Sequence, residues 1–576
     1  MNQKLENILN VSLDATEDEL RKADSLSTGY NWRDNTWEII VKYSGSLESI
    51  RNRYNVYIKE LLNYYAIIVA DKATIELISQ EDVIDYVEKP KSLYYQIERT
   101  KTAACVGNVR AGGGILSGKG VIVGVIDTGI DIFDNAFRNS DGTTRILNIY
   151  DQTTGEKYDK QSIDEYIRLN EDLSGGTFSY DNAPGVDNIM HGTDVSYIAA
   201  GSLGVAYEAD IIAVKMGYSI NNQFPRTTSL MDAIDYIIRK AIEYRKPVAV
   251  NISYGCNYGA HNGNTLLESF IDDISKSYRC VICVGSGNEA DKAIHFGGII
   301  NTGQVQTAYL SVGEYQSAID IQIWKNYWDT IDVMLINPRG EQIGIITEGK
   351  INRYETYNTE IITLLGEPSP YNIYQEIYIN LIPKTDYILS GIWQIVLMAG
   401  NIRAGEYNIW LPSSQALGNA TSFNNPTADG TITIPATARN CIAVGAYNAY
   451  TNSYAAFSGR GFDNSIRNVN AGVKPDITAP GVDISIARQR GNDIIYRNVT
   501  GTSYAVPVVT GAAALLMQWG IVMGNDRFMY GEKLKAALID GSKPVGLAGI
   551  TGNDNHPDPR TGWGAVCLMN TLNKIL

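Results

Sequence analysis

Short, almost wholly apolar runs separated by helical stretches constrain the fold of this chain more than any other feature. The runs are VIVGVI (121–126), IIAVKM (211–216), PVAVNIS (247–253) and CVICVGSGN (280–288). Strands that are apolar on both sides belong to sheets that are covered on both faces, and a helical stretch such as 229–245 supplies such cover. The pattern predicts an α/β domain in which helices flank a parallel sheet.

A different sequence pattern interrupts these buried runs between 296 and 430. Short strands alternate apolar and polar residues there, as in AIDIQIW (318–324) and EIYINLIP (376–383), with polar turns and almost no helical period. This pattern favours an antiparallel β-sandwich, jelly-roll-like, inserted into the α/β domain. The buried-strand pattern returns at 441–448, and a long apolar helix is predicted over 501–519.

The N-terminal segment reads as a separate α+β unit. Predicted strands lie at 37–45, 64–71 and 83–90, with a helix at 73–80. Strand and helix runs of this size suggest a small sheet-and-helix layer. The expected domains are 1–96, 97–295, 296–430 and 431–576, and the second and fourth form one α/β domain around the insert.

The composition excludes several classes of partner. The net charge of −15 and pI near 4.9 would repel phosphate backbones, so no nucleic acid partner is expected. No uninterrupted apolar run reaches the length of a membrane span, so no membrane partner is expected. The start, MNQKLENILNVSLDATEDELRKADS, has no apolar segment of a signal peptide. We therefore expect a chain made in the cytoplasm.

One cysteine pair could suggest redox or zinc chemistry. Cys280 and Cys283 form a C-x-x-C, but they lie in a predicted buried strand, where odd spacing puts them on opposite faces. No second cysteine pair or nearby histidine completes a metal set. We expect buried reduced thiols, no metal and no cofactor.

Ser503, in TGTSYAVPVVTG (500–511), begins the apolar helix, where its hydroxyl is expected to be exposed. A serine hydroxyl is a weak nucleophile unless a base removes its proton and a further group orients that base. His191, in MHGTDVSYIAAGS, lies where a loop enters a helix of small residues, and Asp127 ends a buried strand in GVIDTG. The other histidines, His261, His295 and His556, lie in polar loops without a comparable setting.

Asn288 is the candidate that would stabilise negative charge. It lies just past a predicted strand in VGSGNEA (284–290), among glycines that let a backbone approach closely. Acyl transfer through a tetrahedral intermediate needs fixed donors of this kind, and the N–H of Ser503 at its helix N-terminus would be a second donor.

Other interpretations exist for each motif. The D-T-G at Asp127 also marks aspartic proteases, but these need two aspartates that share a proton, and no second D-T-G or D-S-G occurs here. Taken singly, Ser503 could be a helix N-cap, His191 a surface loop residue, Asp127 a turn cap, and Asn288 a residue in a left-handed turn position.

Together the four motifs resemble the subtilisin-like serine proteases. They are VIDTGID (125–131), HGTDV (191–195), GSGNE (285–289) and GTSYAVPVV (501–509), and the resemblance covers about 118–295 and 431–570. The chain order Asp, His, Ser and an asparagine oxyanion donor are both those of subtilisin. The resemblance implies a subtilisin-like α/β fold and a serine endopeptidase that acts on protein or peptide substrates.

The same resemblance implies a role for each residue. Ser503 would be the nucleophile, His191 the general base and acid, Asp127 the group that fixes the histidine tautomer, and Asn288 the oxyanion donor. Substrate backbone would pair with Ser253, Tyr254 and Gly255, and the facing wall of the specificity pocket would be Gly285, Ser286 and Gly287. The chain departs from the family pattern at Asp194, where a second histidine is usual, and at Tyr504, where methionine is usual.

The missing signal peptide and the inserted β-sandwich make the chain most similar to the Csp-type proteases of clostridia and related gut bacteria. In that group an N-terminal prodomain assists folding, is cut off by the enzyme itself and can remain bound. Members in spores activate a cortex-lytic proenzyme during germination. The resemblance implies a prodomain at 1–96, a tail KSLYYQ (91–96) in the cleft, autocleavage at Gln96 or within four residues of it, and association with spores. Since some members have lost the triad, a binding or scaffold protein is the alternative hypothesis.

Overall fold

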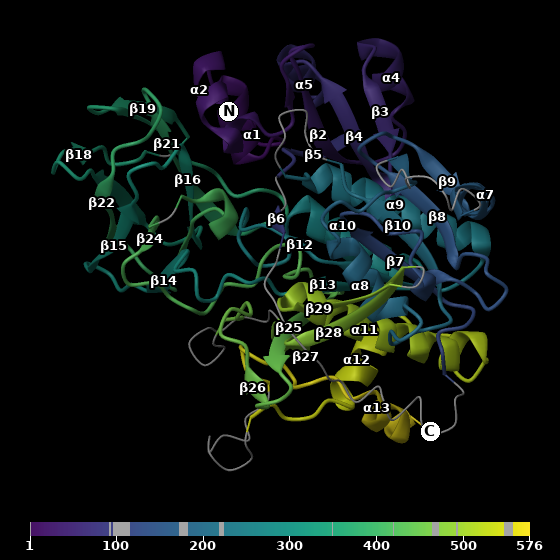
Figure 1. Ribbon diagram of the computed structural model, residues 1–576. Helices are drawn as coiled ribbons and strands as arrows, with labels where there is room; N and C mark the ends of the chain where they lie inside the picture. The colour runs from purple at the N-terminus through teal and green to yellow at the C-terminus, as the bar shows by residue number, and fades with distance from the viewer. Residues whose placement is uncertain are drawn as a thin grey trace.

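The computed structural model describes residues 2–91, 94–95, 116–171, 182–217, 224–347, 349–418, 420–462, 472–490, 493–546 and 557–575. Figure 1 shows three units. The N-terminal unit, in purple, lies above the α/β domain and beside the inserted sandwich, which is drawn in teal and green. The short strands β6 (Tyr94–Tyr95) and β12 (Tyr254–Gly255) pair close to the junction of the three units.

The α/β domain is built on a nine-stranded sheet with the order β26-β25-β13-β11-β7-β10-β8-β9, in which β27 also pairs with β25. Its strands are β7 (Ile122–Asp127), β8 (Ile146–Asp151), β9 (Lys157–Asp159), β10 (Asp210–Lys215), β11 (Val248–Ile252), β13 (Cys280–Gly285), β25 (Ile442–Asn448), β26 (Ser453–Tyr454) and β27 (Ile477–Val482). Every pairing is parallel except β8 with β9 and β25 with β26. The predicted parallel sheet is therefore confirmed.

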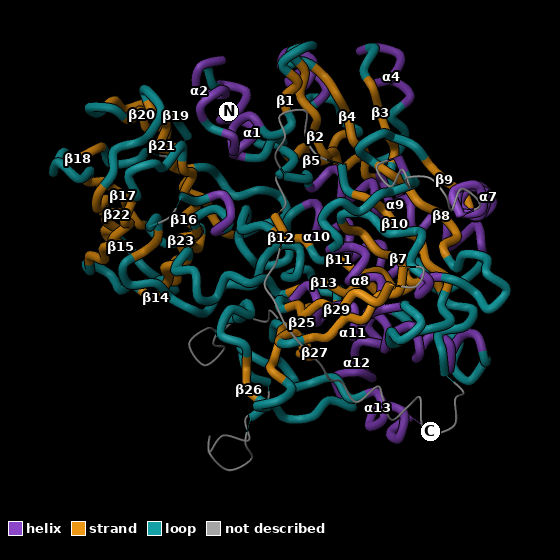
Figure 2. Tube along the Cα trace, in the orientation of Figure 1, coloured by secondary structure: helices purple, strands orange, loops and turns teal. Residues whose placement is uncertain are grey.

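Helices cover both faces of this sheet (Figure 2). They are α7 (Lys160–Glu171), α8 (His191–Ala200), α9 (Thr227–Tyr244), α10 (Leu266–Ser277), α11 (Thr502–Met517), α12 (Gly531–Asp540) and α13 (Leu568–Ile575), with a hairpin of β28 (Ile484–Arg490) and β29 (Asp493–Val499) before α11. Val123 and Val125 of β7 join a core with α8, α11, α12 and α13, while Ile122 and Ile126 join a core with α9 and α10. Consecutive side chains of a strand point to opposite faces, which explains the uninterrupted apolar runs.

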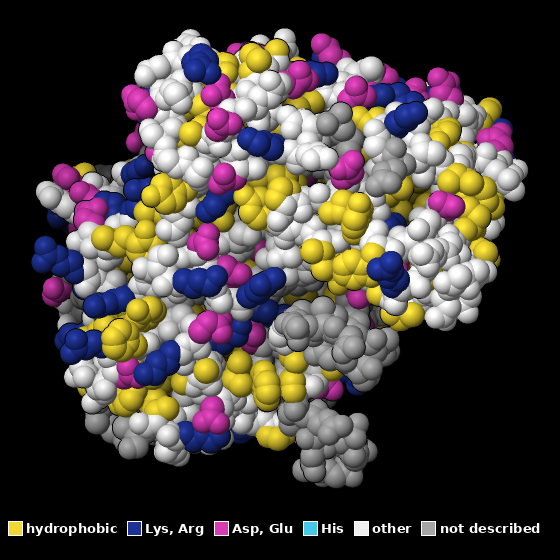
Figure 3. Space-filling model, turned by 180° about the vertical axis from the view of Figure 1, so that it is seen from behind, with side chains coloured by type: hydrophobic (Ala, Val, Ile, Leu, Met, Phe, Trp, Pro, Cys, Tyr) yellow, Lys and Arg dark blue, Asp and Glu magenta, His cyan; other side chains and the backbone are white. Residues whose placement is uncertain are grey.

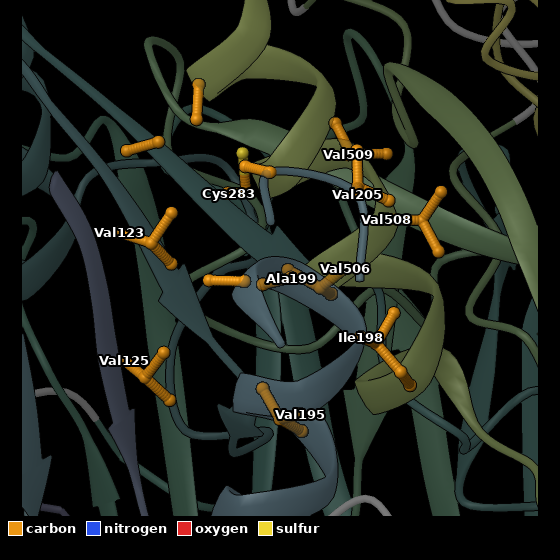
Figure 4. Close-up of a cluster of buried hydrophobic side chains, with 14 of the residues drawn as sticks. Val123, Val125, Val195, Ile198, Ala199, Val205, Cys283, Val506, Val508 and Val509 are labelled. Carbon is orange, nitrogen blue, oxygen red and sulfur yellow. The ribbon is translucent and has the colours of Figure 1, made fainter. Parts of the chain in front are cut away.

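The central helix α11 is buried along its whole length. Figure 4 shows Val506 and Val509 of this helix in one cluster with Val195 and Ala199 of α8 and with Val123. The stretch Thr502–Val522 is apolar enough to cross a membrane, but 83% of its most apolar window is buried inside the protein. It is therefore a core helix.

The C-x-x-C cysteines lie on opposite faces of β13, as predicted. Cys283 belongs to the core with α11, and Cys280 belongs to the core with α9 and α10. Burial raises the pKa of each thiol to about 12. Both are therefore protonated near neutral pH.

The insert is a sandwich of two antiparallel sheets. One has the order β14-β23-β16-β21-β20-β19 and the other β18-β17-β22-β15-β24. The strands are β14 (His295–Ile299), β15 (Val305–Val312), β16 (Ile319–Asn326), β17 (Ile331–Ile336), β18 (Gln342–Ile343), β19 (Ile351–Glu355), β20 (Thr359–Leu365), β21 (Tyr374–Pro383), β22 (Gly391–Ala399), β23 (Glu406–Trp410) and β24 (Ser422–Phe423). Their inward side chains form one apolar core. The first strand begins at His295, one residue before the predicted boundary.

The N-terminal unit has a five-stranded antiparallel sheet of β1 (Tyr30–Asn31), β2 (Thr36–Tyr43), β3 (Tyr57–Glu60), β4 (Tyr65–Ala70) and β5 (Ile84–Glu88). Its helices are α1 (Asn7–Asp14), α2 (Glu17–Lys22), α3 (Asp24–Ser27), α4 (Glu48–Tyr54) and α5 (Lys72–Ile78). Side chains of its sheet pack against α9 and α10, and others share a core with β20 and β21 of the insert. This unit therefore contacts both of the other units.

On the face shown in Figure 3, basic and acidic side chains are intermixed rather than gathered into single-sign patches. The net charge of −15 is therefore not concentrated there.

Candidate active site

Asp127 and His191 form a buried pair. Asp127 is the last residue of β7 and His191 the first residue of α8. The Nδ1 atom of His191 lies 2.6 Å from Oδ1 of Asp127. Because a carboxylate can only accept, Nδ1 carries the proton and Nε2 of the neutral ring is an acceptor. Burial is the largest effect and lowers the pKa of His191, but Asp127, Asp187 and Asp194 together outweigh it, so the net shift raises this pKa.

Asp187 and Thr128 fix the start of α8, and neither was singled out in the sequence. Asp187 Oδ1 accepts from the N–H of Met190 at 2.8 Å, and its Oδ2 accepts from the N–H of Thr193 at 2.8 Å. The Thr128 hydroxyl donates to Asp187 Oδ1 at 2.7 Å and accepts from Gly192 N–H at 2.9 Å. The available signal was an aspartate shortly before a helix start, a usual capping residue.

Helix α11 begins at Thr502, directly after Gly501, and Ser503 is its second residue. Gly501 has φ 145°, a conformation that side-chain-bearing residues rarely adopt, and its N–H donates to Gly481 O at 2.8 Å. The expectation of an exposed hydroxyl was wrong, because Ser503 is 0% exposed. The physical reason is that the helix start is packed on several sides: Thr502 binds Asn288, the Tyr504 ring contacts His191, and Ser253 lies against Ser503 O.

Asn288 lies beyond the end of β13, with its side-chain amide held against the start of α11. Its Oδ1 accepts from the N–H of Thr502 at 3.0 Å and from the Thr502 hydroxyl at 3.1 Å. Its Nδ2 is buried and has no hydrogen-bond partner among the described residues. The Asn288 amide is therefore held in one orientation by its oxygen, while its NH2 group donates to no described residue.

The residues on either side of Ser503 contact the other candidates. Thr502 binds Asn288, and the Tyr504 ring lies 5.2 Å from the His191 ring, centroid to centroid, at 58°. Like Asn288 Nδ2, Nε2 of His191 is buried without a hydrogen-bond partner in the described part of the chain. The structure thus gathers the predicted Asp127, His191, Asn288 and Ser503 at one end of the parallel sheet.

The predicted substrate edge is occupied by the chain itself. Tyr254 pairs with Tyr95 and Gly255 with Tyr94 in an antiparallel ladder. Ser253 instead directs its hydroxyl toward Ser503 O at 3.4 Å. Gln96, the predicted cleavage position, lies outside the described residues.

The two predicted pocket walls are joined by a segment that sequence reasoning missed. We call residues 430–434 the floor segment. The N–H of Thr433 donates to Ser286 O at 3.0 Å, and Ile434 exchanges two backbone hydrogen bonds with Cys256, of 2.8 and 2.9 Å. The floor segment follows the insert in the chain, so no local pattern links it to walls more than 140 positions earlier.

Both departures from the family pattern lie beside the catalytic candidates. Asp194 is fully buried, with Oδ1 3.5 Å from Arg488 Nε and Oδ2 3.0 Å from Arg497 Nη1. The two arginines belong to the hairpin that leads into Ser503. Burial raises the pKa of Asp194 to about 6 despite these arginines.

No group of three or more His, Cys, Asp or Glu side chains suited to a metal ion occurs in the part of the chain that the structure describes.

Comparison with known families decides the class of this site. The profile described as the subtilase family matches residues 118–372 and 395–564. The chain belongs to the subtilase family. The predicted subtilisin-like fold and serine endopeptidase class are thereby confirmed. A second profile, the Csp protease B prodomain, matches residues 3–91, so the N-terminal unit is a prodomain of that type.

A solved relative extends this result. The structure of the Clostridium perfringens CspB protease is 34% identical, covers 82% of this chain and 96% of that one, and gives a TM-score of 0.74. Two curated relatives match shorter stretches. The subtilase-type proteinase RRT12 of Saccharomyces cerevisiae is 39% identical over 88 residues, 15% of either chain. The subtilisin-like protease 10 of Arthroderma otae is 34% identical over 126 residues, which is 20% of this chain and 28% of that one. The match thus spans less than a third of either curated relative.

Proposed function

We propose that this subtilase is an active endopeptidase that uses Ser503 as nucleophile, His191 as base and acid, Asp127 to hold the histidine, and Asn288 as oxyanion donor. One observation carries the proposal: two buried nitrogens, His191 Nε2 and Asn288 Nδ2, have no hydrogen-bond partner among the described residues. Buried polar atoms are almost always paired, so unpaired ones at a helix start favour a role with substrate.

The proposed reaction uses these residues in the following order. The Ser503 oxygen attacks the peptide carbonyl while its proton passes to His191 Nε2, and the resulting oxyanion accepts from Asn288 Nδ2. The imidazolium is stabilised by Asp127 and returns the proton to the leaving amine. Water then hydrolyses the acyl-enzyme with the same histidine as base. The N-terminus of α11 adds partial positive charge near the developing oxyanion.

An active-site label separates this proposal from the scaffold alternative. A fluorophosphonate reacts only with a primed serine, so wild type should be labelled and Ser503→Ala should not. His191→Ala, a matched loss of the base, should also abolish labelling while Ser503 is still present. An unlabelled wild type would favour the scaffold.

We further propose that the enzyme cleaves its own chain near Gln96. The support is the β6–β12 pairing, which lays the tail along the substrate edge immediately before that position. An extended segment that adds to a strand through backbone hydrogen bonds is one of the usual ways in which proteins bind peptides.

The physiological proposal is limited proteolysis of a proenzyme in spores, and it rests on the similarity to Csp-type proteases. Purified enzyme incubated with a cortex-lytic proenzyme should produce one shortened product, and the Ser503→Ala variant should leave the proenzyme intact. Cleavage into many fragments would argue for a general degradative role.

A further inference from the structure

Two histidines without a catalytic role enclose a tryptophan. His261 stacks on Trp410 with ring centroids 4.1 Å apart at 13°, and His295 stacks with centroids 4.9 Å apart at 19°. All three side chains are buried, contrary to the expectation of polar loops for the histidines. His261 follows β12 in the α/β domain, whereas His295 and Trp410 belong to β14 and β23 of the insert. The stack therefore ties the insert to the α/β domain.

Two members of the stack hold the floor segment by its carbonyl groups. Trp410 Nε1–H donates to Gly430 O at 2.9 Å. His261 Nδ1 lies 2.6 Å from Ile432 O, and its Nε2 lies 3.3 Å from Asn257 O. A carbonyl oxygen only accepts, so the short His261 contact is a hydrogen bond donated by the ring.

His295, the third ring of the stack, binds the chain just before the floor segment. His295 Nδ1 lies 3.2 Å from Thr427 O, and its Nε2 lies 3.0 Å from Asn408 Oδ1. The hydroxyl of Thr427 also donates to Gly297 O at 3.0 Å. The chain that leaves the insert is thus bound to the first strand of the insert before it becomes the floor segment.

The next residues of the floor segment bind both pocket walls. Thr433 N–H donates to Ser286 O, and Ile434 pairs with Cys256 next to the substrate edge. The Thr433 side chain lies directly against Gly287, which has φ 95°, because a Cβ at Gly287 would come within 2.5 Å of Thr433 Cγ2. Thr433 therefore contacts the wall segment 285–287 through its side chain as well as its backbone.

We propose that Trp410 and His261 are positioning residues that set the floor of the specificity pocket, so that the insert determines which substrate side chain fits. The inference rests on the proposed function. With the floor held in place, the pocket favours a short or uncharged polar side chain before the scissile bond over a large aromatic one. Releasing the Gly430 or Ile432 carbonyl lets Thr433 retreat, which admits larger side chains.

Trp410→Phe tests the inference, and Trp393→Phe is the matched control. Trp393 is equally buried in the same sandwich and its Nε1–H also donates to a carbonyl, that of Leu389 at 2.8 Å, but it lies on β22 in the other sheet. Both variants lose one indole hydrogen bond and similar ring volume. Only Trp410→Phe loses a bond to the floor segment.

The readout is kcat/KM for two fluorogenic peptides that differ only in having alanine or phenylalanine before the scissile bond. Trp410→Phe should lower the alanine-to-phenylalanine ratio by about tenfold, mainly through KM, within the range that one pocket contact can supply. Trp393→Phe should keep the wild-type ratio. Equal ratios in both variants would overturn the inference.

His261 gives a second test in case Trp410→Phe does not fold. His261→Gln retains a donor for Ile432 O and should keep a ratio close to wild type, whereas His261→Leu should lower it. Equal ratios for the two variants would contradict the positioning role. Fluorophosphonate labelling of Ser503 does not use the pocket. Absence of label in wild type therefore overturns the proposed function and this inference together, and label with unchanged ratios overturns this inference alone.

Discussion

At the scale of single residues, the surroundings of His191 set the pH at which the base is available. Its pKa is raised by Asp127 first, and also by Asp187 and Asp194, against the effect of burial. In the proposed mechanism the neutral ring accepts the Ser503 proton, so activity should rise as pH increases through this raised pKa. The acid limb of the pH profile therefore reports the charges around the ring.

Asp194→Asn should move that acid limb to lower pH. The substitution removes a negative charge that favours imidazolium and leaves Arg488 and Arg497 nearby, so both effects lower the pKa of His191. The measurement is kcat/KM against pH. Glu156→Gln, the same loss of charge at an exposed position, should leave the limb in place. If the acid limb of Asp194→Asn stayed in place or moved to higher pH, the pKa of His191 would not be what sets this limb.

Asn288→Ala should lower kcat by about 100- to 1,000-fold with little change in KM, the range known for the oxyanion asparagine of subtilisin itself. Thr502→Val removes only the hydroxyl that binds Asn288 Oδ1 and leaves the Thr502 N–H bond. It should therefore cost much less. Steady-state kinetics measure kcat and KM for both variants. An equal loss of kcat in Asn288→Ala and Thr502→Val would show that the Asn288 amide only packs against the helix start and does not bind the oxyanion.

At the scale of elements, strands and helices with a strong apolar pattern could be predicted, as β7, β13 and α11 show. The capping box of α2, in which Thr16 and Glu19 bind each other, was visible as Thr-x-x-Glu but lies in a polar stretch without an apolar period. The floor segment could not be predicted, because its partners Ser286 and Cys256 are brought to it only by the fold. Motif order located Asp127, His191, Asn288 and Ser503, but it could not show that Ser503 is buried.

Asp187 lies outside the four motifs, but its carboxylate binds the N-terminus of α8, the helix that begins with His191. Asp187→Ala leaves several buried donors without an acceptor, so it should cost roughly 2–4 kcal/mol of stability and also lower kcat by disordering His191. Asp71→Ala removes an exposed helix cap of α5 and should cost only about 1 kcal/mol, with kcat unchanged. Denaturant unfolding and kinetics together test this. A normal kcat in Asp187→Ala would separate the helix start from catalysis.

At the scale of the whole molecule, the prodomain is held from two sides. Thr227 N–H donates to Lys91 O at 2.7 Å, and Glu88 accepts from Leu266 N–H at 2.9 Å, both on the α/β domain. Arg353 of the insert binds Asp14 at 2.8 Å and Glu19 at 3.0 Å. Apolar side chains of the prodomain share a core with β20 and β21. We propose that the cleaved prodomain remains bound.

The cleaved fragment should therefore elute with the enzyme in gel filtration. Lys91 is buried between Glu6 at 2.8 Å and Glu88 at 2.5 Å, all three in the prodomain, and Glu88 also accepts from Leu266 N–H of the α/β domain. Lys91→Met leaves two buried carboxylates without their cation, so it should destabilise the prodomain at this contact and weaken its binding to the α/β domain. Arg353→Ala removes two ion pairs of a partly exposed arginine, with Asp14 and Glu19, and should retain the fragment. Dissociation of the wild-type fragment during the column run would contradict the proposal.

The central claim is that Ser503 carries out the chemistry at the cleft occupied by the prodomain tail. The most direct test is intact mass and N-terminal sequencing of purified wild type beside Ser503→Ala. We predict that wild type splits near Gln96 into two fragments while Ser503→Ala stays whole. A wild type that stays whole, or an alanine variant that splits at the same position, would contradict the claim.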